Sequence, residues 1–155
     1  MPPFASRVGL MVLLAGSLLS AAHLYAQHDE DQEEAPLVVT ADFNRDGIAD
    51  IASVGANGRL TVRLGRSDGT FLETASMPVS ERKPRALIAD DFNRDNIPDL
   101  LIGNEDGTVM LFLSDGTGRF APGRTIAYLE SVTSIAVADF NKDGIADIAV
   151  SDSRA

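Results

Sequence analysis

The chain lacks the residues on which much protein chemistry depends. Of its 155 residues none is cysteine and none is tryptophan, and its two histidines are His23 and His28. Without cysteine there is neither a disulfide framework nor thiolate chemistry. Beyond residue 28 there is no imidazole for general-base catalysis, for a catalytic triad or for zinc. We therefore expect that the protein is not an enzyme.

Positive charge is also scarce. Lysine and arginine together number 13, against 23 aspartates and glutamates, so the net charge at pH 7 is −10. An acidic chain repels the phosphates of nucleic acid, and the sequence has no basic patch with interleaved aromatic residues. We expect no nucleic-acid partner.

The first 36 residues differ in composition from the rest. Arg7 precedes an apolar stretch over residues 8–22 that ends in small residues, and Leu24-Tyr25-Ala26 follows with a small residue at the cleavage site, which is the pattern of a secretory signal. We assign residues 1–26 to a signal peptide. An uncleaved membrane anchor is the alternative, since residues 8–26 approach the ~20 that span a bilayer. Residues 27–36 are expected to form an acidic, disordered linker. The predicted location is secreted or periplasmic at the cell envelope, with no stable membrane span after cleavage.

One nine-residue acidic segment occurs three times. Residues 42–50 read DFNRDGIAD, residues 91–99 read DFNRDNIPD, and residues 139–147 read DFNKDGIAD. Their first aspartates are 49 and 48 residues apart, a spacing that predicts a repeat architecture. Because the close carboxylates of the chain lie in these loops, we assign them to cation coordination and not to glycosidase-type acid and base catalysis.

Each segment offers only oxygen donors. Positions 1, 5 and 9 carry carboxylates, position 3 carries an amide, and a main-chain carbonyl lies near position 7. Calcium accepts six to eight oxygens at about 2.3–2.6 Å in irregular geometry, whereas magnesium needs a stricter octahedron and zinc prefers nitrogen or sulfur. Glycine at position 6 (Gly47, Gly144) permits a positive φ. Asn96 replaces it in the second segment, which we predict to be the weakest site. The basic residues at position 4, which are Arg45, Arg94 and Lys142, are expected to point into solvent.

The residues around each segment predict strands. Short apolar runs precede and follow each segment, whereas an EF-hand requires flanking helices and a bidentate glutamate at position 12. Position 12 is here occupied by Ser53, Ile102 and Val150. Asn57-Gly58 and Asp106-Gly107 precede third strands and predict two-residue hairpin turns with positive φ at both central residues. A fourth strand is expected to begin at Phe71 and again at Phe120.

Four short strands per repeat are typical of a β-propeller blade. The sequence resembles the FG-GAP or VCBS-type repeats, the family that includes the calcium-bearing blades of integrin α-subunit propellers. This resemblance implies an all-β fold of four-stranded antiparallel blades. We place repeat 1 at residues 37–84, repeat 2 at residues 85–133 and a partial repeat 3 at residues 134–155. Phe43, Phe92 and Phe140, at position 2 of the loops, are expected to be core anchors.

The resemblance also implies up to three Ca²⁺ ions, each held by the side chains at positions 1, 3, 5 and 9 and by the carbonyl at position 7. The implied ligands are Asp42, Asn44, Asp46, Ile48 and Asp50 for the first ion, Asp91, Asn93, Asp95, Ile97 and Asp99 for the second, and Asp139, Asn141, Asp143, Ile145 and Asp147 for the third. We expect no catalytic residue and no other cofactor.

The chain departs from the family in its length. About two and a half repeats are present, whereas a closed propeller has four to eight blades. Copies of the chain can assemble into a ring, the sequence can be part of a longer gene product, or it can persist as an open array. The third strand of repeat 1 has a polar face with Thr61 and Arg63, where repeat 2 has Met110 and Phe112. This difference predicts that the first blade has an exposed face and that the second is covered on both sides.

The predicted function is that of an exported calcium-binding module with structural calcium. It would bind an unidentified extracellular protein or glycan, in adhesion or another interaction at the cell envelope or outside. The alternative is a fragment or non-catalytic accessory segment of a larger exported propeller enzyme.

Overall fold

The structure is a computed structural model that describes residues 35–79 and 81–152. Within these ranges the chain forms ten strands and no helix, and therefore contains no helix long and apolar enough to cross a membrane. The expected signal peptide, and all of the acidic linker except its last two residues, lie outside the described residues.

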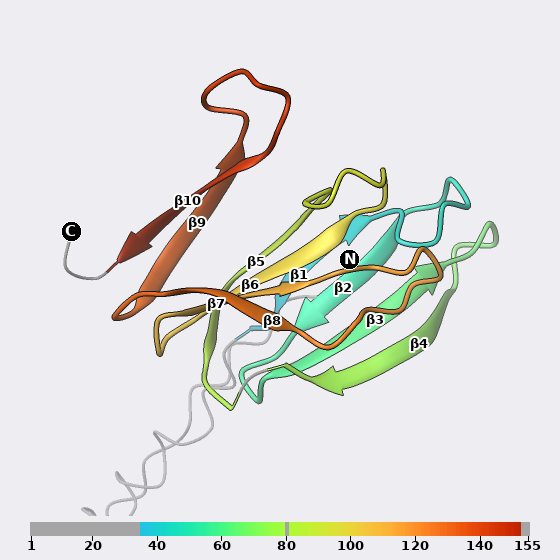
Figure 1. Ribbon diagram of the computed structural model, residues 1–155. Helices are drawn as coiled ribbons and strands as arrows, with labels where there is room; N and C mark the ends of the chain where they lie inside the picture. The colour runs from blue at the N-terminus through green and yellow to red at the C-terminus, as the bar shows by residue number, and fades with distance from the viewer. Residues whose placement is uncertain (1–34, 80, 153–155) are drawn as a thin grey trace, which may run out of the picture. The chain divides into compact units, whose positions relative to one another are not determined.

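The ten strands form three antiparallel sheets (Figure 1). Sheet 1 contains, in spatial order, β1 (Leu37–Ala41), β2 (Asp50–Val54), β3 (Arg59–Gly65) and β4 (Phe71–Pro78). Sheet 2 repeats this order with β5 (Pro84–Asp90), β6 (Asp99–Asn104), β7 (Thr108–Phe112) and β8 (Arg124–Tyr128). Sheet 3 pairs β9 (Val132–Ala138) with β10 (Asp147–Asp152). The fold is therefore all-β, with propeller-like blades that do not close a ring within the described residues.

Each acidic loop joins the first two strands of its sheet. The residue before the loop faces the last aspartate of the loop across the strand pair: Ala41 faces Asp50 and Asp90 faces Asp99, and Ala138 faces Asp147. The apolar runs on either side therefore form the predicted hairpin, and the loop closes at a cross-strand pair.

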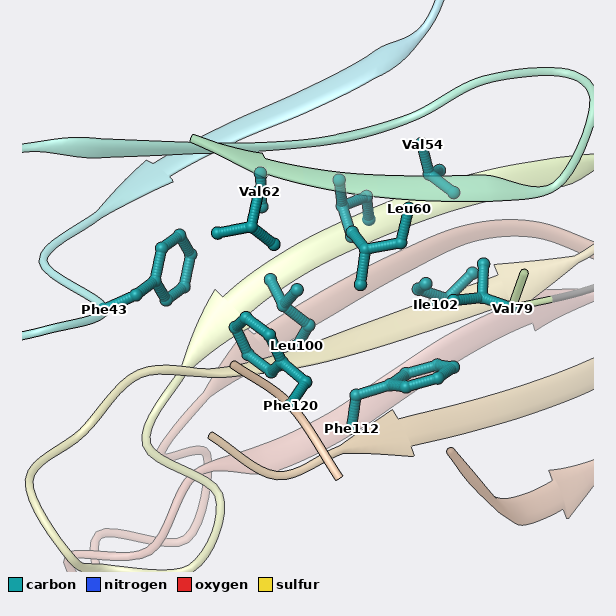
Figure 2. Close-up of a cluster of buried hydrophobic side chains, with 11 residues drawn as sticks. Phe43, Val54, Leu60, Val62, Val79, Leu100, Ile102, Phe112 and Phe120 are labelled. Carbon is teal, nitrogen blue, oxygen red and sulfur yellow. The ribbon is translucent and has the colours of Figure 1, made fainter. Parts of the chain in front are cut away.

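Two clusters of buried side chains hold the sheets together. The first, between sheets 1 and 2, contains Phe43, Ala52, Val54, Leu60, Val62, Val79, Leu87, Leu100, Ile102, Phe112 and Phe120 (Figure 2). The second, between sheets 2 and 3, contains Leu101, Val109, Val132 and Ile135.

Strand β6 is buried along its whole length because successive side chains point to opposite faces of a sheet. Leu100 and Ile102 enter the first cluster, and Leu101 enters the second. Sheet 2 is thus covered on both faces, as predicted. On sheet 1, Arg63 is exposed on the face turned away from sheet 2, which agrees with the predicted exposed face of the first blade.

The hairpin turns differ from the prediction. Gly58 has φ 67° and Gly107 has φ 83°, but the residues before them do not have positive φ. The N–H of Gly58 donates to the carbonyl of Gly55 at 2.9 Å, and the N–H of Gly107 to that of Asn104 at 3.0 Å. These are therefore longer turns that end in a left-handed glycine, a common alternative to the two-residue primed turn. The Gly107 position excludes a side chain, since a Cβ there would lie 2.0 Å from the carbonyl oxygen of Leu129.

Of the three phenylalanines predicted to be core anchors, only Phe43 is fully buried. Its ring meets that of Phe120 edge to face, with 5.4 Å between centroids and an angle of 74° between planes. Phe92 is half-buried against the second cluster. The prediction is wrong for Phe140, which is 60% exposed, because no counterpart of Phe120 covers it within the described residues. The fourth strand begins at Phe71 as predicted, but in sheet 2 it begins at Arg124.

Candidate metal centres

The first acidic loop is folded around the carboxylate of Asp42. The Oδ1 atom of Asp42 accepts a hydrogen bond from the N–H of Asp46 at 3.1 Å, and its Oδ2 atom accepts one from Gly47 at 2.8 Å. The side chain of Asn44 accepts from the same Asp46 N–H at 3.0 Å, and the side chain of Asp46 accepts from Ile48 at 2.8 Å. Positions 1, 3 and 5 are therefore turned toward the interior of their own loop.

The same four hydrogen bonds recur in the other two loops. They measure 2.8 to 3.1 Å in the second loop and 2.7 to 3.0 Å in the third. In each loop the amide nitrogen at position 3 also donates to the carboxylate at position 5, at 2.8, 2.9 and 3.0 Å in chain order. The second loop therefore keeps these five hydrogen bonds with Asn96 in place of glycine, and it has one more, from the N–H of Arg94 to the Oδ1 atom of Asp91 at 2.7 Å.

The loop backbone takes left-handed conformations at two positions. Position 6 has φ of 81°, 63° and 78° at Gly47, Asn96 and Gly144, as the sequence predicts. Position 4 has φ of 61°, 67° and 63° at Arg45, Arg94 and Lys142, which sequence reasoning missed. Each non-glycine residue in this region costs about 1–2 kcal/mol, so the hydrogen bonds of the loop must offset this cost.

The aspartate at position 9 has a structural function that sequence reasoning also missed. Asp50 is fully buried, and its two carboxylate oxygens accept main-chain hydrogen bonds from Phe43 and Gly65, both at 2.8 Å. Asp99 likewise accepts from Phe92 at 3.3 Å and from Ser114 at 2.8 Å. In both sheets this carboxylate therefore connects the acidic loop to the chain at the end of the third strand (Gly65) or just beyond it (Ser114).

A small residue at the end of the third strand is the sequence signal for this contact. A Cβ on Gly65 would lie 2.4 Å from the carbonyl oxygen of Ala49, so the close approach requires glycine there. Asp147 has no such second anchor among the described residues, and it accepts instead from Phe140 at 3.0 Å and from Asn141 at 3.3 Å, both exposed.

Burial raises the pKa of the Asp99 carboxyl, and the negative charges of Asp95 and Asp91 raise this pKa further. The hydrogen bonds that Asp99 accepts from Ser114 and Phe92 oppose this rise in pKa. A cation bound in this loop would favour the ionised form of Asp99.

The basic side chains at position 4 are exposed, as expected. The guanidinium of Arg45 nevertheless donates a hydrogen bond to the main-chain carbonyl of Asp95, in the second loop. The first two acidic loops are therefore in direct contact.

The residues of each loop fit calcium by type and by order. Every side-chain donor is an oxygen, and a carboxylate oxygen that accepts one hydrogen bond keeps a second lone pair for an ion. In residues 35–79 and 81–152, however, no three carboxylates converge closely enough to share one ion. The structure brings positions 1, 3 and 5 together in each loop, whereas the position 9 carboxylates of Asp50 and Asp99 are held by main-chain N–H groups.

The fold and the three loops define a repeat protein made of propeller-like blades. Two overlapping stretches of the chain, residues 42–102 and 91–150, match the FG-GAP-like repeat. The chain therefore belongs to the FG-GAP repeat family, as its motifs predict. No curated protein matches it in sequence.

Proposed function

We propose that this chain is an exported calcium-binding repeat module in which calcium is structural. The observation that carries the proposal is the threefold recurrence of one oxygen-donor set in one hydrogen-bonded loop conformation. Nine carboxylates occupy these three loops. Without a cation, two carboxylates about 4 Å apart repel each other by roughly 4 kcal/mol at an effective dielectric near 20.

Bound calcium would stabilise the acidic loop that joins the first and second strands of each sheet. At millimolar calcium and a dissociation constant near 10 μM, each bound ion would add about 2.7 kcal/mol to the free energy of unfolding. A small domain has only about 5–15 kcal/mol in total. Calcium would therefore supply a large share of the stability of the module under export conditions.

The module would act by binding, and not by catalysis. The loop carboxylates are accounted for by the proposed cation binding and by main-chain hydrogen bonds, and apolar side chains such as Phe71 and Phe140 remain exposed for binding. The partner would be an extracellular protein or a glycan, since FG-GAP repeats are typical of extracellular proteins and the proposed signal peptide would direct export.

Isothermal titration of the purified chain with calcium tests this proposal. We expect three ions per chain, and the loss of one ion from each of the variants Asp46→Ala, Asp95→Ala and Asp143→Ala. The matched control is Asp106→Ala, which removes an aspartate from the β6–β7 turn outside the loops and should leave the stoichiometry at three. The absence of binding heat in the unaltered chain, or an equal loss in the control, would contradict calcium coordination by these loops.

A further inference from the structure

Two exposed phenylalanines occupy the same repeat positions as a buried pair. Phe43, at position 2 of the first loop, is buried against Phe120, which is 6% exposed. Phe140 stands at position 2 of the third loop and is 60% exposed. Phe71 lies 49 residues before Phe120 and is 48% exposed. Phe140 is therefore the repeat equivalent of Phe43, and Phe71 is the repeat equivalent of Phe120.

The outer face of sheet 1, which is the face turned away from sheet 2, carries apolar residues at two more positions that are buried in the contact between sheets 1 and 2. Val38 and Ile51 lie 49 residues before Leu87 and Leu100, which are buried against sheet 1. Val38 is 55% exposed, whereas Leu87 is 8% exposed. The outer face of sheet 1 therefore presents a weaker copy of the surface by which sheet 2 packs onto its neighbour.

The outer face of sheet 3, which is the face turned away from sheet 2, carries small side chains. Ala136 and Ala149 stand where sheet 2 has Ile88 and Leu101, 48 residues earlier. A shallow hollow of about 210 Å³ lies here, lined by Ser134, Ala136, Ala149, Val150 and Ser151. Small side chains on one face can receive larger ones from the facing sheet, so this hollow suits Val38 and Ile51.

We propose that these two faces bind each other between two copies of the chain. The outer face of sheet 3 of one copy packs on the outer face of sheet 1 of the second copy, and Phe140 meets Phe71 of that copy as Phe43 meets Phe120. Each copy carries one face of each kind, so the contact is head to tail.

The described residues of each copy form two four-stranded sheets and the two-stranded sheet 3, so two copies joined at both contacts bring together 3 + 3 = 6 sheets, a number within the four to eight blades of closed propellers. Closure at a dimer also avoids the open filaments to which unclosed head-to-tail contacts lead. The ion pair of Arg63 with Glu73, 3.2 Å long, is exposed on the outer face of sheet 1, and its desolvation on association would weaken the contact. The dimer is therefore expected to dissociate on dilution.

Sedimentation velocity of the full chain over a range of concentrations, with calcium and with chelator, tests the proposal. The unaltered chain should reach twice its monomer mass. Phe71→Ser and Ala149→Glu should each remain at the monomer mass, and Val38→Asp should do the same as a second lesion on the outer face of sheet 1. The matched control Tyr128→Ser changes an aromatic residue that is 80% exposed on β8, and it should dimerise like the unaltered chain.

A mixture of Phe71→Ser with Ala149→Glu gives the sharpest result. Each mixed pair can form one unaltered contact, so a dimer should reappear in the mixture although neither variant dimerises alone. A monomer at every concentration for the unaltered chain overturns the proposal, and so does a dimer that Phe71→Ser, Val38→Asp and Ala149→Glu leave intact. A mixture that stays monomeric overturns the head-to-tail arrangement. Thermal melting of each variant shows whether it is folded, and dimerisation without calcium-binding heat would separate this inference from the calcium proposal.

Discussion

Removing the carboxylate of Asp50 tests whether the position 9 aspartate is part of the fold independently of any metal. In Asp50→Ala two main-chain N–H groups, those of Phe43 and Gly65, lose the acceptors that now lie at 2.8 Å. Phe43 and Gly65 are both buried, and each unsatisfied buried group costs about 1–3 kcal/mol. The free energy of unfolding should therefore fall by about 2–6 kcal/mol, a large share of the roughly 5–15 kcal/mol of a small domain.

Urea unfolding in the presence of chelator measures this loss without a contribution from calcium. The matched control is Asp147→Ala, because the N–H groups that Asp147 accepts from are exposed and water replaces the lost carboxylate. The control should lose less than about 1 kcal/mol. A free energy of unfolding for Asp50→Ala within about 0.5 kcal/mol of the unaltered chain, or equal losses of stability in the two variants, would refute the stabilising function of Asp50 as a buried hydrogen-bond acceptor.

Five further substitutions test the same geometry. Phe43→Ala should lower the free energy of unfolding by about 3–5 kcal/mol. Phe140→Ala, at an exposed position, should change the free energy of unfolding of the monomer by less than about 0.5 kcal/mol. Urea unfolding of both variants measures the difference. Gly65→Ala places a Cβ against a carbonyl oxygen and should lower the free energy of unfolding by about 1–3 kcal/mol. Gly69→Ala should lower it by less, because only the backbone conformation is strained there and no atom lies within 4 Å. Thermal melting of the two variants measures the difference. Asn96→Gly should raise the stability by about 1 kcal/mol by removing left-handed strain, and a titration should show tighter calcium binding by the second loop.

The repeat architecture was predictable because one motif carries both the period and the strand boundaries. The segments at residues 42–50, 91–99 and 139–147 form the loops of three hairpins. The apolar runs on either side of each segment, alternating or continuous, form the strands. The difference between Arg63 and Phe112 identified which sheet is covered on both faces. These features are local in sequence, so they can be read without the fold.

The features that the sequence analysis missed or predicted wrongly depend on contacts and strand pairing that a local motif does not contain. The hydrogen bond from the N–H of Gly65 to Asp50 joins residues 15 positions apart, and its one signal in the sequence is the small residue at the end of the third strand. The exposure of Phe140 follows from the missing neighbour of its ring, which a position within a motif does not reveal. The turn at Gly58 was predicted wrongly because a glycine with positive φ also ends longer hairpin loops, and the strand register selects which turn forms.

The most direct test of the account is the melting temperature of the chain in millimolar calcium and in chelator. Each occupied loop would add about 2.7 kcal/mol for a dissociation constant near 10 μM. Calcium should therefore raise the melting temperature by on the order of 10 °C or more, and an equal concentration of magnesium should raise it by less. A melting temperature that is the same in calcium and in chelator would contradict the claim that these three loops bind structural calcium.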